Sequence, residues 1–308
     1  MSFAIVCDVT CDLSQEIREK FDIDYIKGHW ALPDGSEMPT TLDWDAISSE
    51  EFYSKLRKNP DGYHTSPPSV MEIYEHFKKY VEKGTGIFYT CMTSAMSGTF
   101  DFATSAKEKL LKEYPDAQIY LVDSRKFATG AGLLAVLAAV KRSQGVSLYD
   151  TYLYAEAIKP RIHQAGWHDD LAFTAKKGRI SNAKAFMGTL IGIKPVGDFS
   201  ESGLTTVLCK VKGEKTAFRV LLDYIGETIE DPENQIILVA GSDRKEQSQR
   251  YLELIKERYH PKEIYYTDIF RASGTNAGPG IMAAYYVGKP LSKDLKEETE
   301  IYERLSKK

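Results

Sequence analysis

The amino-acid sequence predicts an α/β protein with two domains: an α/β/α domain with a parallel sheet, then an α/β domain with a mixed sheet. Its 308 residues and 43% hydrophobic content suffice for a sizeable core and fit two domains better than one. In the first half, short apolar runs alternate with amphipathic stretches, which is typical of a parallel sheet covered on both faces. In the second half the strand-like runs suggest a mixed sheet.

The first half contains four strand-like runs separated by helical periodicity. The expected strands are Phe3–Val6, Tyr25–Leu32, Gly86–Cys91 and Gln118–Val122. The expected helices are Leu13–Phe21, Ile47–Leu56, Val70–Tyr80, Phe100–Tyr114, Ala131–Lys141 and Leu148–Ile158. We expect these elements to form a first domain over residues 1–165.

The second half, residues 166–308, has more strands and fewer helices. The expected strands are Leu171–Thr174, Ile193–Val196, Thr205–Val211, Ile236–Ala240, Ile264–Asp268 and Ile281–Val287. The expected helices are Phe218–Ile229 and Tyr251–Tyr259, and the Lys- and Glu-rich C-terminus is a solvated helix or tail. The turn signal Ser202-Gly203 favours a hairpin between two of these strands.

Composition narrows the class of protein. The formal net charge is −4 and the pI is about 6.0, without the basic surplus of a duplex-binding protein. The four cysteines are scattered, which favours reduced, buried thiols over disulfides. The longest apolar segment, Ala131–Val140, is far shorter than the roughly 20 residues of a membrane span. With no secretory signal visible at the N-terminus, we expect a cytoplasmic protein without an integral membrane segment.

Two hydroxyl-rich segments precede predicted helices. Thr65-Ser66-Pro67-Pro68-Ser69 reads first as an ordinary helix start. Ser94–Thr99 follows a predicted strand and opens a helix, an arrangement in which free amides and the helix dipole attract an anion. Ligands gather at the carboxyl ends of strands in open α/β sheets, so both segments could converge there on one carboxylate or phosphate.

Two further segments are candidates for binding. Lys176–Ser181 is either a solvated basic loop or a cationic contact for an anionic ligand or a partner. Gly274–Gly280 lies between two predicted strands and is either a tight connection or a backbone that holds Thr275 and Asn276 beside a ligand.

Signatures of common enzymes are missing from the sequence. There is no phosphate-binding G-x-x-x-x-G-K-[ST] loop, no G-x-S-x-G elbow and no H-E-x-x-H. The six histidines form no recognised metal-ligand spacing, and His163 and His168 are most simply surface residues. No catalytic residue or metal ligand is therefore expected.

The order of these motifs over most of the chain resembles the DegV family, which includes the fatty-acid-binding subunits of bacterial fatty acid kinase. The matching segments are Asp8–Leu13, Thr65–Ser69, Ser97–Thr99, Val122–Ser124, Gly178–Ser181, Lys194-Pro195 and Gly274–Gly280. The resemblance implies an α/β/α domain with a parallel sheet, an α/β domain with a mixed sheet, and a long-chain fatty acid bound between the domains.

The resemblance also implies roles for individual residues. Thr65 and Ser97 would hydrogen-bond the ligand carboxylate, and the acyl chain would lie in an apolar tunnel. Further ligand-binding residues would be Ser66, Gly98, Thr99 and Asn276, and candidate contacts to ligand or partner would be Arg179, Lys212 and Thr275. No cofactor besides the bound fatty acid is implied.

Three positions depart from the family pattern. Asn276 stands where His is usual, Lys212 where Arg is frequent in members that serve a kinase, and Val9 where Ser is usual. An asparagine can still hydrogen-bond a carboxylate but carries no charge, and a lysine keeps the charge without the bidentate fork of arginine. These changes bear more on presentation to a kinase than on lipid binding.

The leading hypothesis is therefore a binding protein that presents a fatty acid to a partner kinase for acyl-phosphate formation. The first alternative is a fatty-acid carrier or sensor that is not coupled to a kinase, which Asn276 favours. The second is an enzyme that acts on a small phosphorylated substrate at the same helix starts.

Overall fold

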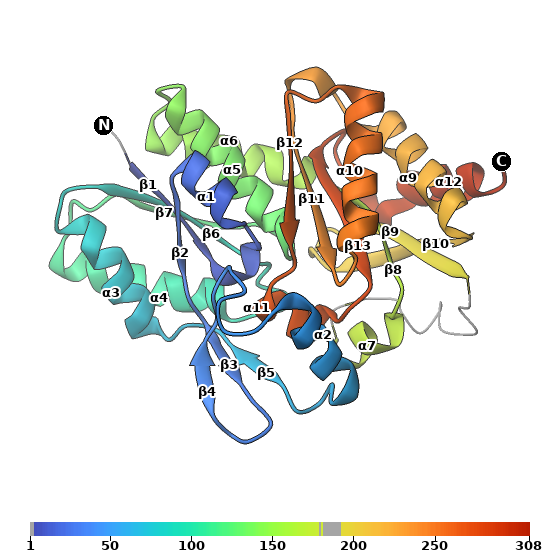
Figure 1. Ribbon diagram of the computed structural model, residues 1–308. Coiled ribbons are helices and arrows are strands. Elements are labelled where there is room, and N and C mark those ends of the chain that lie inside the picture. The colour runs from blue at the N-terminus through green and yellow to red at the C-terminus, as the bar shows by residue number, and fades with distance from the viewer. Residues whose placement is uncertain (1–2, 179, 181–191) are drawn as a thin grey trace.

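The protein is built around two large sheets with helices between them and further helices on both outer faces. The computed structural model describes residues 3–178, 180 and 192–308 (Figure 1). A parallel sheet comes from the first half of the chain and a mixed sheet from the second half, which confirms the predicted fold class. A small third sheet was not predicted.

The first sheet has four parallel strands in the order β2-β1-β6-β7. The strands are β1 (Phe3–Asp8), β2 (Ile23–Ile26), β6 (Gly86–Cys91) and β7 (Ile119–Asp123). One face packs against α3 (Val70–Val81) and α4 (Thr99–Glu113), and the other against α1 (Gln15–Phe21), α5 (Thr129–Ser143) and α6 (Leu148–Ile158). Serines at the caps, such as Ser69 with its reciprocal partner Glu72 at α3, start several of these helices.

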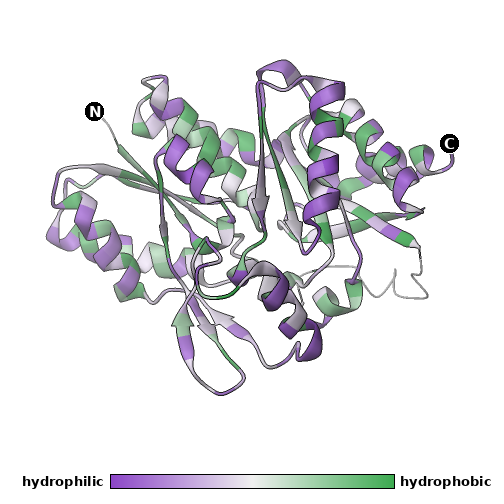
Figure 2. Cartoon of the chain, viewed as in Figure 1, coloured by the Kyte–Doolittle hydropathy of each residue, from purple (hydrophilic) through white to green (hydrophobic). Residues whose placement is uncertain are grey.

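The second sheet has six strands in the order β10-β9-β8-β13-β11-β12, and β11–β12 is its parallel pair. The strands are β8 (Ile162–His168), β9 (Ile193–Phe199), β10 (Thr205–Lys212), β11 (Ile236–Ser242), β12 (Glu263–Asp268) and β13 (Ile281–Val287). The helices α9 (Glu214–Thr228), α10 (Lys245–Tyr259) and α12 (Lys296–Ser306) cover the outer face, with their apolar sides inward (Figure 2). The predicted hairpin is confirmed as the antiparallel pair β9–β10.

The third sheet is antiparallel and lies beside the carboxyl edge of the first. It consists of β3 (His29–Ala31), β4 (Glu37–Pro39) and β5 (His64–Ser66), and α2 (Ser49–Lys58) packs on it. The single strand predicted over Tyr25–Leu32 is wrong, because the chain leaves the first sheet after β2 and enters the third at β3. Gly28 lies at this crossing, where a Cβ atom would be 2.9 Å from the carbonyl oxygen of Ser66.

One other predicted element is wrong, and the glycine-rich connection contains a helix that was not predicted. The strand expected at Leu171–Thr174 is the helix α7 (Leu171–Lys176), and the side chain of Asp170 caps it by accepting a hydrogen bond from the backbone N–H of Phe173. The glycine-rich connection begins within the helix α11 (Arg271–Ala277), and Gly278 and Gly280 take positive φ angles only after it. Short apolar runs do not distinguish a buried strand from a buried helix.

The strand β8 escaped prediction because polar residues interrupt its pattern, yet all seven of its residues are buried. His163 and His168 lie on this strand and are 0% and 6% exposed, so their expected surface position is wrong. The strand runs between β9 and β13 and has helices on both faces. Tertiary packing therefore buries residues that the sequence would leave in water.

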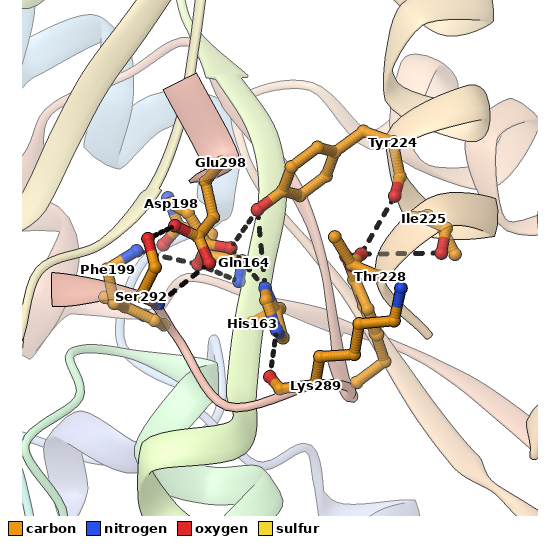
Figure 3. A network of polar contacts seen from close by, with 11 residues as sticks. His163, Gln164, Asp198, Phe199, Tyr224, Ile225, Thr228, Lys289, Ser292 and Glu298 are labelled. Carbon is orange, nitrogen blue, oxygen red and sulfur yellow. Dashed lines mark hydrogen bonds and ion pairs between the residues drawn. The ribbon is translucent and has the colours of Figure 1, made fainter. Parts of the chain in front are cut away.

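A buried polar network ties β8 to β9 (Figure 3). Asp198 accepts hydrogen bonds from His163 Nδ1 at 2.6 Å, the Tyr224 hydroxyl at 2.7 Å and the backbone N–H groups of Gln164 and Phe199 at 2.6 and 2.7 Å. His163 Nε2 faces the carbonyl oxygen of Lys289 at 2.8 Å. Both carboxylate oxygens are thus satisfied without water, as burial of a charge requires.

Replacing Asp198 with alanine should lower the free energy of unfolding by about 3–5 kcal/mol, because buried donors, including His163, would be left without an acceptor. Urea denaturation followed by circular dichroism measures this loss. The control is Asp61→Ala, which removes an exposed carboxylate paired with Lys176 and should leave stability nearly unchanged. Equal effects of the two changes would contradict a structural role for the network.

Candidate functional site

A cavity of about 260 Å³, here called the outer cavity, lies where the carboxyl ends of β1 and β6 meet the third sheet. Its lining includes Asp8 from the end of β1, Thr65 and Ser66 from β5, Ser97 to Thr99 at the start of α4, and Asn276 from α11. Residues far apart in the sequence therefore meet at the sheet edge where α/β proteins place their ligands.

Six of the residues expected to bind a ligand line this cavity: Thr65, Ser66, Ser97, Gly98, Thr99 and Asn276. The candidate contacts Thr275 and Lys212 are elsewhere. Thr275 is buried in α11, and its hydroxyl has no hydrogen-bond partner among the residues that the structure describes. Lys212 is exposed at the far end of β10, roughly 23 Å along the strand from Thr205. Arg179 lies outside the described residues.

Ser97 and Thr99 at the start of α4 line the cavity and share a hydrogen bond between their hydroxyls, which leaves one of the two hydroxyl hydrogens for a ligand. Ser97 Oγ accepts the backbone N–H of Thr99 at 3.3 Å and lies 2.8 Å from Thr99 Oγ1. Gly98 occupies the N-cap position without a side chain that could take the free amides of the first turn. The helix has 15 residues, and its dipole favours an anion at this end.

Thr65 on β5 supplies a further hydroxyl to the lining, and the amide of Asn276 bonds to it. Asn276 donates its amide hydrogens to Thr65 Oγ1 at 2.8 Å and to the carbonyl oxygen of Ala272 at 3.1 Å. Since Thr65 Oγ1 accepts this bond, its own hydrogen is available for a ligand. The helix start predicted for the segment Thr65–Ser69 lies at Ser69, which caps α3. Thr65 and Ser66 lie on β5 instead.

Asp8 gives the outer cavity an unusual electrostatic character. Its side chain is 2% exposed and accepts the Thr10 hydroxyl at 2.8 Å. Burial raises the pKa of Asp8 to about 6, although hydrogen bonds from Thr10 and Cys11 oppose the shift. His29 is the other titratable residue of the lining, and its Nε2 lies 3.1 Å from Glu72 Oε2.

The charge balance of the outer cavity favours a ligand with little negative charge. No lysine or arginine is part of its lining among the described residues. Hydroxyl and amide donors can satisfy one carboxylate, whereas a phosphate dianion beside Asp8 would need a compensating cation. Within residues 3–178, 180 and 192–308 there is also no cluster of His, Cys, Asp or Glu suited to a metal ion.

An inner cavity of about 30 Å³ lies next to the outer one and is mainly apolar. Its lining comes from the α5 start, from β8, β9, β10 and β13, and from α7 and α11, and includes Phe127, Trp167, Val207, Ile281 and Tyr285. His168 also faces it, and burial lowers the pKa of His168 to about 4, so the imidazole is neutral at pH 7. An outer cavity lined by polar donors thus lies next to an inner cavity that is mainly apolar.

Asp8, His29 and Phe127 line the site but were not predicted as site residues. Asp8 could have been found, because it ends a predicted strand at the carboxyl edge of the sheet. His29 and Phe127 carry no local signal. Their positions depend on the third sheet and on the contact between the two large sheets.

Sequence comparisons match this chain to one family over most of its length. The family model described as "Uncharacterised protein, DegV family" matches residues 2–289. A DegV domain-containing protein from Clostridium perfringens is 32% identical over 288 residues, which cover 93% of this chain and 97% of the relative.

Solved structures share the fold at low sequence identity. A DegV family protein from Thermus thermophilus, described as binding fatty acid, superposes with a TM-score of 0.82 at 21% identity and covers 94% of this chain and 100% of its own. The fatty acid kinase B3 protein from Streptococcus pneumoniae, loaded with linoleic acid, gives a TM-score of 0.78 at 19% identity with the same coverage.

Within the described residues, no helix is both long and apolar enough to cross a membrane.

The variant Asp8→Asn should gain stability relative to the unchanged protein as the pH rises from 4 to 7. Between the ordinary carboxyl pKa of ~3.9 and the folded value of about 6, the folded chain binds more protons than the unfolded one, so the unchanged protein loses stability with rising pH. The gain in the free energy of unfolding of the variant, relative to the unchanged protein, should reach at most about 3 kcal/mol. Urea denaturation at each pH measures it. A difference that does not vary with pH would contradict the raised pKa.

Proposed function

The chain belongs to the DegV family, and on that premise we propose that it binds one long-chain fatty acid without catalysing a reaction itself. The carboxylate would occupy the outer cavity and the hydrocarbon tail would extend into the inner cavity. The observation that carries this proposal is the pair of hydroxyl groups, on Thr65 and Ser97, that line one cavity to which no described residue contributes a cation.

The carboxylate would be held by neutral donors from two sides. Thr65 would donate a hydrogen bond from β5 while Asn276 keeps its oxygen occupied, and Ser97 would donate from the start of α4. Ser66, Gly98 and Thr99 would support these contacts from the same lining. The positive end of α4 would balance the ligand charge, which Asp8 opposes when it is ionised.

The tail would supply most of the binding free energy. At about 0.8 kcal/mol for each buried methylene, a long acyl chain contributes on the order of 10 kcal/mol before the costs of association. Trp167, Ile281 and Tyr285 offer apolar surface for this burial, and the neutral His168 adds no charge to it. The Thermus and Streptococcus relatives, described with fatty acid, support the same ligand class.

The alternative of an enzyme for phosphorylated substrates receives less support. A phosphate in the outer cavity would lie beside Asp8 without an arginine or lysine from the lining described above. A carboxylate has one negative charge, which hydroxyls and amides can meet.

We further propose that the protein presents the bound acid to a kinase, and the fatty acid kinase B3 relative supports this role. The open mouth of the outer cavity would leave the carboxylate accessible to a catalytic subunit. Asn276 favours the second candidate, a carrier or sensor without a kinase, because both its amide hydrogens are engaged within the protein and it carries no charge.

Denaturing extraction of the purified protein, followed by mass spectrometry of the organic phase, should release one fatty acid per chain. The double variant Thr65→Ala with Ser97→Ala should retain less than a tenth of it, because both hydroxyl donors are lost. The control is Ser105→Ala with Ser143→Ala, two exposed hydroxyls that bond only carbonyls of their own helices. A clean extract, together with no thermal stabilisation by added palmitate, would refute the proposal.

Acid-loaded protein mixed with ATP and a bacterial fatty acid kinase catalytic subunit should yield acyl-phosphate, which hydroxylamine traps for detection. Without the subunit no acyl-phosphate should form, because the proposed role is binding alone. Unchanged acid in the complete mixture would instead favour the carrier, and product without the subunit would show catalysis by this chain.

A further inference from the structure

Phe127 lies at the junction between the two cavities. It is the one residue, among those the structure describes, that lines both the outer and the inner cavity. Its side chain is 7% exposed and packs into the core between the two large sheets. The ring of Phe127 thus borders both the site of the hydroxyls and the site of Trp167.

The sizes of the cavities show what the ring controls. The outer cavity has about 260 Å³, whereas the inner cavity has about 30 Å³, room for molecules the size of water. A short acid can be held by its carboxylate in the outer cavity alone. A long acyl chain reaches the inner cavity only when side chains around it move, and Phe127 is the side chain that borders both cavities among the residues the structure describes.

The backbone beside Phe127 is strained. Arg125 and Ala128 have φ angles of 48° and 52°, and Ala128 combines this with a ψ of −139°, a region that residues with a side chain rarely adopt. Such conformations persist only where the surroundings impose them, and they cluster at ligand clamps and switch regions.

Contacts from both large sheets impose this conformation. Ser124 Oγ accepts the N–H of Lys126 at 3.1 Å and donates to its carbonyl oxygen at 3.2 Å. The β9–β10 turn packs closely against the same segment: a Cβ atom on Gly203 would be 2.4 Å from the carbonyl of Arg125. In addition, Thr93 Oγ1 donates to the carbonyl oxygen of Ser202 at 2.7 Å. The position of Phe127 therefore depends on contacts between the two halves of the chain.

We infer that Phe127 is a gate that separates the carboxylate site from the tail site and determines which acyl chain lengths the protein accepts. This inference rests on the proposed function and adds the residue that selects the ligand. Acids that fit in the outer cavity bind without moving the ring. Longer acids bind only when the ring moves aside, at a rate that its displacement limits.

The test compares hexanoate and palmitate on the full chain. Stopped-flow tryptophan fluorescence follows palmitate, since Trp167 lines the inner cavity, and competition against palmitate gives the affinity of hexanoate. Phe127→Ala should raise the association rate of palmitate at least tenfold and change the Kd of hexanoate by a much smaller factor, because hexanoate loses only its contact with the ring in the outer cavity. Phe127→Leu, a milder change that better preserves packing, should give an intermediate rate.

Two controls separate gating from a general change in the cavities. Met96→Ala alters the lining of the outer cavity only and Ile281→Ala that of the inner cavity only, so neither should speed palmitate association. Circular dichroism confirms folding, and Phe127→Leu carries the test if the alanine variant does not fold.

The outcomes distinguish the gate from the proposed function. Palmitate binding at an unchanged or lower rate in the Phe127 variants would overturn the gate and leave fatty-acid binding intact. The same would follow if hexanoate and palmitate changed in parallel. Failure of the unchanged protein and all variants to bind either acid would overturn the proposed function and the gate with it.

Discussion

The burial of α5 between the two large sheets is the constraint on which the rest of the structure depends. Its sequence is rich in alanine, glycine and leucine, and ten of its residues are buried. Gly132 lets the helix approach the segment after β1 so closely that a Cβ atom would be 2.3 Å from the carbonyl oxygen of Cys11. On the other side, Gly130 meets the ring of Phe199 in the second sheet. One helix thus serves both cores and sets the distance between them.

This close contact also explains where the cavities lie. The loop that enters α5 carries Phe127 and emerges at the carboxyl edge of the first sheet, where strands of an α/β domain present their ligands. Because the second sheet packs against the same helix, its strands β8, β9 and β13 supply apolar walls directly beside that edge. A polar site and an apolar site therefore adjoin at the contact between the two halves, which suits an amphipathic ligand.

The polar site depends on neutral donors. Thr65 and Ser97 supply hydroxyls, Asn276 fixes the orientation of one of them, and the start of α4 supplies the dipole. Asp8 lies in the same lining, where burial already raises its pKa. A bound carboxylate would further disfavour the charged form of Asp8, so a proton on Asp8 and an anionic ligand would stabilise one another. The asparagine at position 276 keeps this balance neutral, whereas a histidine could add a positive charge.

The sequence by itself determined the fold class and most helices and strands, because periodicity and caps are local properties of the chain. The resemblance of its ordered motifs to a family supplied six residues that line the outer cavity. The sequence did not determine that β8 is buried with His163 and His168, that Leu171–Lys176 is a helix, or that the chain divides at Gly28 between two sheets. It also did not reveal Phe127 as the residue shared by the two cavities. These features arise from contacts between segments far apart in the sequence. Burial and neighbours there override local preference, so only the tertiary structure decided them.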